Sequence, residues 1–176
     1  MMLKKNDIRK KFIKLRNELS PVRRSIASKK SLKILKLNFS KILSFGPKFK
    51  EINLWSLNKQ LALENRLYLP KVNALNLDVF EVTNPDNQLI KGKFNILEPD
   101  PTKCKKIDPS KISCVLVPAI VFDKNHNRLG FGRGYYDRFL QSLNCTKLGV
   151  GFLEQLSHSK LPHEIHDIKL DHLFLF

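Results

Sequence analysis

Hydrophobic residues in the first 45 positions recur with helical spacing, and basic residues fill the positions between them. The apolar positions of the first segment are Ile8, Phe12, Leu15 and Leu19. This pattern predicts an amphipathic, basic helix. A second helix is expected to begin with Ser20 as its N-cap and Pro21 at its first position. It is predicted to run to about Phe39 or Leu43, before Gly46 and the following proline end it.

From residue 51 the hydrophobic period shortens to that of β-strands. Apolar runs predict strands at residues 52–57, 66–72, 77–82, 111–117, 147–152 and 173–176. Helical spacing returns between Tyr136 and Leu143. Strands interleaved with helices predict an α/β fold, with a layered and mostly parallel sheet and helices on both of its faces. We expect one catalytic domain over residues 1–176, with residues 1–45 as its basic helical part and residues 85–109 as a proline-dotted surface connection.

Charge changes the picture because it is unevenly distributed. The formal net charge is +16, and residues 1–50 hold 16 lysines and arginines against two acids, Asp7 and Glu18. This bias favours an anionic partner, which is nucleic acid, a membrane surface or a multiply charged small molecule. Three cysteines without a C-x-x-C pair fit free thiols in a reducing cytosol. No apolar run has the length of a signal peptide or a membrane span, so we expect a cytoplasmic protein without a membrane partner.

The stretch RLGFGRGYYDRFL, residues 128–140, carries the most specific pattern in the chain. Three of the seven glycines alternate here with other residues, after the buried strand 111–117 and before a helix. Glycines let backbone N–H groups approach a phosphate, and Arg128 and Arg133 add fork-shaped donors. Tyr135 and Tyr136 break both standard phosphate-loop motifs. Taken alone, the glycines fit a tight turn beside solvated arginines as well as they fit a phosphate site.

Residues 117–140, VPAIVFDKNHNRLGFGRGYYDRFL, closely resemble the signature of the 5-formyltetrahydrofolate cyclo-ligases, also called methenyltetrahydrofolate synthetases. Weaker similarities follow the same order along the chain: Lys5-x-x-x-Arg9, GKFNILEP at 92–99 and LPHEIHDIKLD at 161–171. The resemblance implies an ATP-dependent ligase that cyclises 5-formyltetrahydrofolate to 5,10-methenyltetrahydrofolate. It also implies that the formyl oxygen is phosphorylated first, because an amide oxygen cannot leave as oxide.

The resemblance further implies a role for each matched residue. Arg133 and Tyr136 are the expected catalytic residues. ATP is expected to contact Lys5, Arg9, Arg128, Gly130, Phe131, Gly132, Arg133, Gly134, Tyr135, Tyr136 and Asp137. The folate is expected to contact Trp55, Gln60, Gly132, Arg133, Gly134, Tyr135 and Tyr136. Asp137 and Asp171 are the expected ligands of Mg²⁺, and Asp123 is a less favoured candidate.

One segment departs from the family pattern. Gln60 stands where the family has an acidic residue that contacts folate, with Glu64 as the nearest substitute. The segment 56–66 also leaves too little chain for the helix that the family places after its first strand. This departure keeps open a degenerate member that binds nucleotide or folate without turnover.

A basic nucleic-acid-binding protein is the alternative from another class. It is disfavoured because the sequence has no nucleic-acid motif, its lysines are scattered around the helices, and the glycine loop would have no role. His163 and His166 lack the spacing of a metal pair and are read as surface or hydrogen-bonding residues. We therefore expect ATP and a folate, with or without a polyglutamate tail, as partners of a monomer that binds no nucleic acid.

Overall fold

The computed structural model describes residues 5–48, 50–92 and 95–176. Its helices are α1 (Lys5–Glu18), α2 (Pro21–Ser31), α3 (Trp55–Leu63) and α4 (Tyr135–Gln141), with short 3₁₀ turns at Leu32–Lys36, Pro109–Lys111 and Leu153–Gln155. As predicted, Ser20 caps α2: its hydroxyl accepts a hydrogen bond from the backbone N–H of Arg23 at 3.2 Å, and Pro21 follows at the first helical position.

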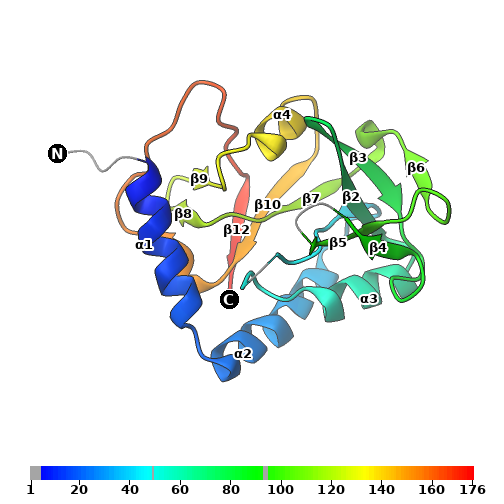
Figure 1. Ribbon diagram of the computed structural model, residues 1–176, viewed down its shortest axis with the longest axis horizontal. Helices are drawn as coiled ribbons and strands as arrows, with labels where there is room; N and C mark the ends of the chain where they lie inside the picture. The colour runs from blue at the N-terminus through cyan, green and yellow to red at the C-terminus, as the bar shows by residue number, and fades with distance from the viewer. Residues whose placement is uncertain (1–4, 49, 93–94) are drawn as a thin grey trace.

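A seven-stranded sheet forms the centre of the molecule (Figure 1). Its strands, in spatial order, are β12 (His172–Leu175), β10 (Thr146–Gly151), β7 (Cys114–Val117), β1 (Ile42–Leu43), β2 (Leu67–Asn73), β3 (Asn76–Glu81) and β6 (Lys105–Ile107). The first five strands of this order are parallel to one another, whereas β3 is antiparallel to β2 and β6 is antiparallel to β3. The predicted mostly parallel α/β sheet is confirmed.

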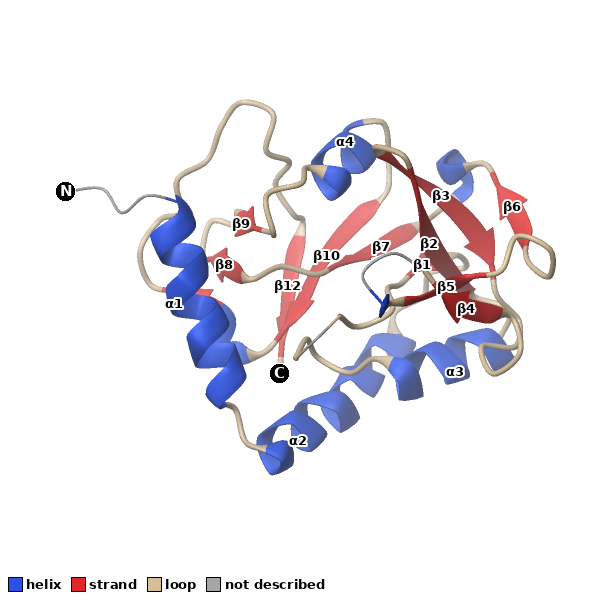
Figure 2. Ribbon diagram, viewed as in Figure 1, coloured by secondary structure: helices blue, strands red, loops and turns tan. Residues whose placement is uncertain are grey.

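Helices cover both faces of the sheet, with α2 and α3 on one side and α4 on the other (Figure 2). Neighbouring residues along each strand point to opposite faces, so both faces need apolar residues. Ile42 packs in the cluster of α2 and α3, whereas Leu43 packs in the cluster of α4. This double burial explains the continuous apolar run that marked β7 in the sequence.

Helix α1 packs against a small three-stranded sheet and not against the large one (Figure 1). That sheet consists of β11 (Leu156–Ser157), β8 (Val121–Asp123) and β9 (Arg128–Leu129). Ile8 and Phe12 of α1 pack with Val121 and Leu129 in one buried cluster. This contact places the basic face of α1 beside the loop that follows β9.

Four expectations about the elements are wrong. Residues 52–57 do not form a strand, because Leu54, Leu57 and Leu61 are buried with the spacing of α3. The nine-residue α3 also shows that this segment has room for a helix. The second helix ends at Ser31, and Ile42–Leu43 is the central strand β1. The connection 85–109 contains β4 (Leu89–Lys91), β5 (Leu97–Pro99) and β6.

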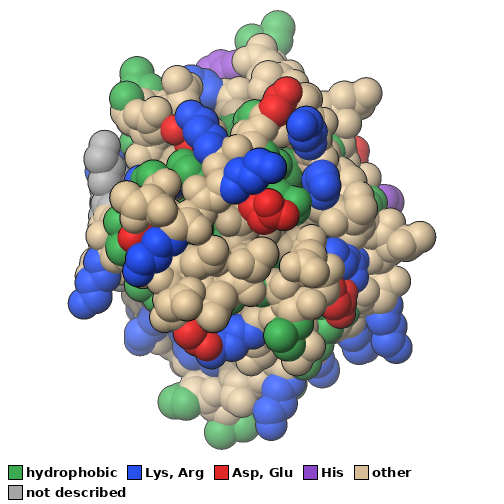
Figure 3. Space-filling model, turned by 90° about the vertical axis from the view of Figure 1, so that its right-hand side faces the viewer, with side chains coloured by type: hydrophobic (Ala, Val, Ile, Leu, Met, Phe, Trp, Pro, Cys, Tyr) green, Lys and Arg blue, Asp and Glu red, His purple; other side chains and the backbone are tan. Residues whose placement is uncertain are grey.

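The surface carries mixed charge on the face that Figure 3 shows. Lysine and arginine side chains are scattered there among acidic and apolar ones and form no continuous basic field. In the described part of the chain, no helix is both long enough and apolar enough to cross a membrane.

Candidate functional site

A cavity of about 620 Å³ lies at the carboxyl ends of the parallel strands, between α1 and the strands β2, β3 and β5. This position and size are typical of small-molecule sites in α/β proteins. Its phosphate side, as we name it here, is formed by Lys5, Arg9, residues 128–138, Glu164, His166 and Asp167. Its strand side is formed by Phe45, Gly46, Pro70, Val72, Leu77, Ile96, Leu97 and Glu98.

The glycine loop, residues 130–134, connects β9 to α4 and lines the cavity. Gly132 and Gly134 have φ values of +86° and +68°, which side chains disfavour. Arg9 of α1 donates from Nε to the carbonyl of Gly130 at 2.8 Å. A Cβ at Gly132 would lie 3.3 Å from the Arg9 guanidinium. The glycines therefore allow both the turn and the close approach of Arg9.

Arg138 of α4 supports the same loop from the other side, and sequence reasoning gave it no role. Its guanidinium donates to the carbonyls of Leu75 at 2.8 Å and Arg133 at 3.1 Å. A Cβ at Gly134 would lie 2.6 Å from Arg138 Nη1. The only feature of the sequence that points to Arg138 is its position inside residues 117–140, the stretch that resembles the family signature.

Arg128 and Asp137 form a partly buried ion pair at 2.6 Å. Arg128 also donates to the carbonyl of Ile168, and the backbone N–H of Ile168 points to Asp137 at 3.5 Å. Burial lowers the pKa of the Arg128 guanidinium, although the charge of Asp137 opposes this shift. The pair joins β9, α4 and the segment before β12, so Arg128 has a structural task as well as a place in the cavity wall.

Lys5 joins α1 to the segment before β12. Its ammonium contacts Glu164 at 2.7 Å and Asp167 at 3.1 Å. Partial burial lowers the pKa of Lys5, but the hydrogen bonds to these two carboxylates outweigh it and raise the pKa above its ordinary value. The hydrogen bond from Lys5 lowers the pKa of Glu164. Burial opposes the shift at Asp167, whose pKa is still lowered by the backbone N–H of Glu164 and by Lys5.

Two aromatic residues of the loop region also line the cavity. Phe131 is 44% exposed, with Lys48 Nζ at 5.0 Å from its ring centre and the Arg16 guanidinium at 5.8 Å. Tyr136 is half-buried, and burial, followed by the nearby charge of Glu51, raises the pKa of its phenol. Burial also raises the pKa of Glu51, against the hydrogen bond from the backbone N–H of Lys48. Tyr136 is therefore a hydrogen-bond donor at neutral pH and not a base.

The structure brings most of the expected site residues to one place. All of the expected ATP contacts line the cavity: Lys5, Arg9, Arg128, Gly130, Phe131, Gly132, Arg133, Gly134, Tyr135, Tyr136 and Asp137. Five of the expected folate contacts, residues 132–136, are among them. This convergence joins residues of α1 to a loop more than 120 positions away, and it favours a ligand site over a simple turn.

Three expected residues do not line the cavity. Gln60 is exposed on α3, and Trp55 packs against the core under α3. Asp171 accepts a hydrogen bond from the backbone N–H of Lys147 at 2.7 Å, near the amino end of β10. The structure therefore does not bring Asp171 into the cavity with Asp137.

Other acids of the sequence have different surroundings. Asp123, the second choice for a metal ligand, is 1% exposed and accepts backbone hydrogen bonds from Asn127 and Leu161, both at 2.9 Å. It fixes a turn. The acids of the cavity that sequence reasoning left without a role are Glu51, Glu98, Glu164 and Asp167. Glu98, Glu164 and Asp167 lie in the segments 92–99 and 161–171, which resemble the family more weakly. This resemblance is the only feature of the sequence that points to these three acids.

Comparison with known proteins agrees with this geometry. The model of the 5-formyltetrahydrofolate cyclo-ligase family matches residues 1–175. The 5-formyltetrahydrofolate cyclo-ligase of Mycoplasma genitalium is 27% identical over 172 residues, which cover 97% of this chain and 96% of that protein. The enzyme of the same name from Haemophilus influenzae is 31% identical over 125 residues, 68% of this chain and 67% of that protein.

Solved structures show the same fold. The Aquifex aeolicus 5,10-methenyltetrahydrofolate synthetase superposes with a TM-score of 0.85 at 32% identity, covering 96% of this chain and 88% of that one. The Mycoplasma pneumoniae 5,10-methenyltetrahydrofolate synthetase, at 24% identity, shares the fold with a TM-score of 0.76 over 97% of this chain and 98% of that one. With its glycine loop, its basic α1 and a family match over nearly its whole length, the chain belongs to the 5-formyltetrahydrofolate cyclo-ligase family.

Proposed function

We propose that this protein converts 5-formyltetrahydrofolate and ATP to 5,10-methenyltetrahydrofolate, ADP and phosphate. The observation that carries the proposal is that one cavity combines a cation-rich phosphate side with a more apolar strand side. The phosphate side suits a triphosphate, and the strand side suits a flat heterocycle. The family match supports this enzyme function over a nucleic-acid-binding one.

The reaction has two chemical steps. The formyl oxygen attacks the γ-phosphorus, and the bond from that phosphorus to ADP breaks. N10 then attacks the formyl carbon, the carbon–oxygen bond breaks with phosphate as the leaving group, and the N10 proton is released. The first step depends mainly on positioning and charge stabilisation, because phosphoryl transfer needs little covalent help from the protein.

The residues of the glycine loop serve the first step. Backbone N–H groups of residues 130–134 cradle the phosphates, and Arg9 holds the loop in shape through its bond to Gly130. Arg133 neutralises charge that develops on the transferring group. Tyr136, with its raised pKa, donates a hydrogen bond to an oxygen of the reacting groups.

Mg²⁺ is the metal we propose for the nucleotide. Asp137 and Asp167 both line the phosphate side, and two carboxylates with phosphate oxygens and water form the ligand set that Mg²⁺ prefers. These oxygens fit the ion, although the described residues contain no cluster of three or more His, Cys, Asp or Glu side chains that could hold a metal without a substrate. Bound Mg²⁺ would neutralise phosphate charge. Asp167 thus replaces Asp171 in our assignment.

The metal assignment predicts different effects for three isosteric variants. Asp137→Asn and Asp167→Asn should each raise the Mg²⁺ concentration for half-maximal activity by about 10-fold, since each removes a negative oxygen ligand. Asp171→Asn is the matched control and should leave that concentration unchanged. A metal titration of the three purified variants measures it. Equal shifts for Asp167→Asn and Asp171→Asn would contradict the assignment.

Four finer features complete the proposal. The whole chain acts as one catalytic unit, in the cytoplasm and as a monomer. The glutamate tail of the folate, with or without further glutamates, extends from the cavity towards solvent. Size-exclusion chromatography with light scattering tests the monomer, and a comparison of KM for mono- and polyglutamylated substrate tests the tail.

The activity itself is tested by mixing the pure protein with 5-formyltetrahydrofolate, ATP and Mg²⁺. The expected result is near-ultraviolet absorbance of the methenyl product, with one ADP formed per product. Reactions without ATP or without the folate are the controls. Binding of either ligand without any product would instead establish the non-catalytic alternative.

A further inference from the structure

Arg138 of α4 bridges two segments that belong to different sides of the cavity. Its Nε and Nη2 donate to the carbonyl of Leu75 at 3.1 and 2.8 Å, and Nη2 also donates to the carbonyl of Arg133 at 3.1 Å. Leu75 lies in the turn that joins β2 to β3, whereas Arg133 belongs to the glycine loop. One guanidinium therefore fixes the separation between this hairpin and the glycine loop.

The hairpin of β2 and β3 supplies part of the strand side of the cavity. Val72 and Leu77 are paired across its two strands, and both line the cavity. The turn between the strands consists of Ala74 and Leu75. A second bond from α4 reaches this turn, because the Tyr135 hydroxyl donates to the carbonyl of Ala74 at 3.3 Å. Helix α4 thus holds the hairpin through two successive carbonyls of its turn.

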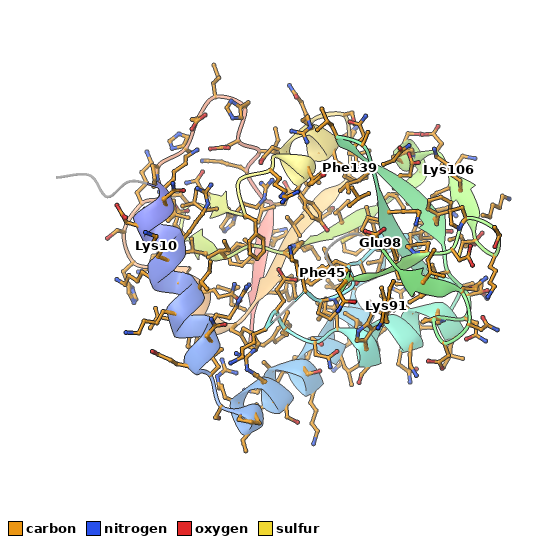
Figure 4. The ribbon with its side chains drawn as sticks, in the orientation of Figure 1. Lys10, Phe45, Lys91, Glu98, Lys106 and Phe139 are labelled. Carbon is orange, nitrogen blue, oxygen red and sulfur yellow. The ribbon has the colours of Figure 1, made fainter. Side chains whose placement is uncertain are left out.

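The glycine loop is shaped around the same guanidinium. Gly134 leaves the space that Arg138 Nη1 occupies, and the guanidinium lies 5.5 Å from the ring centre of Tyr135. The Arg138 side chain is exposed, whereas Phe139, the next residue, is buried between α4 and the large sheet (Figure 4). Replacing Arg138 therefore removes the bridge and leaves the packing of α4 in place.

Charge alone does not explain this arrangement. In the described part of the chain, the hydrogen-bond acceptors of Arg138 are main-chain carbonyls. A planar guanidinium presents several donors in a fixed fork and serves both carbonyls at once. An ammonium is a point charge on a flexible stem and does not fix the same geometry. Position 138 thus needs the shape of arginine as well as its charge.

We propose that Arg138 is a positioning residue that couples the binding of the folate to the binding of ATP. The folate occupies the strand side and the triphosphate the glycine loop, so a ligand that orders the hairpin also orders the loop through Arg138. The second ligand then binds a site that the first has already ordered. The bridge also sets the distance from the formyl oxygen to the γ-phosphorus, on which phosphoryl transfer depends. This role rests on the proposed function, because it takes 5-formyltetrahydrofolate and ATP as the ligands.

The test measures the affinity for each ligand with and without the other. Calorimetry uses the β,γ-imido analogue of ATP with Mg²⁺, so that no phosphoryl transfer occurs. In the wild type, bound 5-formyltetrahydrofolate should tighten binding of the analogue about 10-fold, and the analogue should tighten the folate by the same factor, because coupling is reciprocal. In Arg138→Met this factor should fall below about 2-fold, while the affinity for each ligand alone changes less than about 3-fold. The kcat of this variant should fall about 10-fold or more.

Two further variants separate the bridge from charge and from side-chain packing. Arg138→Lys keeps the charge without the fork and should lose the coupling as Arg138→Met does. Leu75→Ala keeps the accepting carbonyl and removes a side chain that is 68% exposed, so it should retain the coupling and kcat.

Three outcomes would contradict the positioning role and leave the proposed function standing. The wild type binds both ligands without coupling, Arg138→Met keeps the wild-type factor, or this variant weakens each ligand alone as strongly as it weakens the pair. If the wild type neither binds nor converts 5-formyltetrahydrofolate, both proposals fail.

Discussion

At the scale of single residues, the positive φ angles of the glycine loop explain why glycines occupy these positions. Gly132 has a φ of +86° and faces the Arg9 guanidinium, whereas Gly130 has open space around its Cα. A side chain at position 132 meets both backbone strain and a close neighbour. A side chain at position 130 meets neither.

The pair predicts a difference in stability. Gly132→Ala should lower the free energy of unfolding by about 1–3 kcal/mol, because alanine is strained at this φ and would push Arg9 away. Gly130→Ala is the matched control and should change it by less than about 0.5 kcal/mol. Urea unfolding followed by circular dichroism measures both. A larger loss for Gly130→Ala would show that the loop geometry is wrong.

Arg133 belongs to the same loop, where its side chain is exposed and packs in no core cluster. Arg133→Ala should lower kcat by about 10²-fold, because the charge of Arg133 acts on the transferring phosphoryl group. The melting temperature of this variant should stay close to that of the wild type. A raised KM for ATP with kcat intact would contradict the transition-state role.

At the scale of the elements, α1 links three parts of the molecule. Its apolar face packs on the small sheet, Arg9 reaches the glycine loop, and Lys5 reaches Glu164 and Asp167. These contacts make α1 a wall of the cavity as well as a source of positive charge. The basic α2, in contrast, exposes Lys29 and Lys30 at its end.

This contrast predicts that ATP binding depends on where the positive charges lie and not on how many there are. Lys5→Ala or Arg9→Ala should weaken ATP binding about 10-fold, because each loses a contact at the phosphate side. Lys29→Ala combined with Lys30→Ala removes more charge from exposed positions and should leave the affinity nearly unchanged. Calorimetric titration with ATP measures all three proteins. Equal losses would favour a diffuse electrostatic effect.

Patterns of a few adjacent residues correctly predict those structural features that depend on these residues alone. The cap of α2 depends on Ser20 and Pro21 alone, and it formed as expected. The sequence of residues 52–57 predicts a strand wrongly, because Ile52, Leu54 and Leu57 fit a strand as well as the start of a helix. The packing of α3 against the sheet decides between a strand and a helix. The side chain of Asn58 accepts a hydrogen bond from the Ser44 hydroxyl and donates one to the carbonyl of Phe45. Short apolar runs are ambiguous for this reason.

At the scale of the whole molecule, the path of the chain decides which residues share the cavity. The stretch 128–137 could be predicted as a site because one continuous segment supplies it. Asp167 and Asp171 lie in one matched segment, and only the fold places Asp167 in the cavity and Asp171 at the amino end of β10. Glu98 reaches the cavity through the pairing of β5 with β4, which no sequence pattern indicated.

The proposed reaction depends on transfer of the γ-phosphoryl group of ATP to the formyl oxygen inside the cavity. The most direct measurement uses 5-formyltetrahydrofolate with ¹⁸O in its formyl group, followed by mass spectrometry of the released phosphate. Because the carbon–oxygen bond breaks after the phosphorus–oxygen bond forms, we predict one ¹⁸O atom in each phosphate that accompanies a methenyl product. Unlabelled phosphate, with the ¹⁸O in water or formate, would contradict phosphorylation of the formyl oxygen.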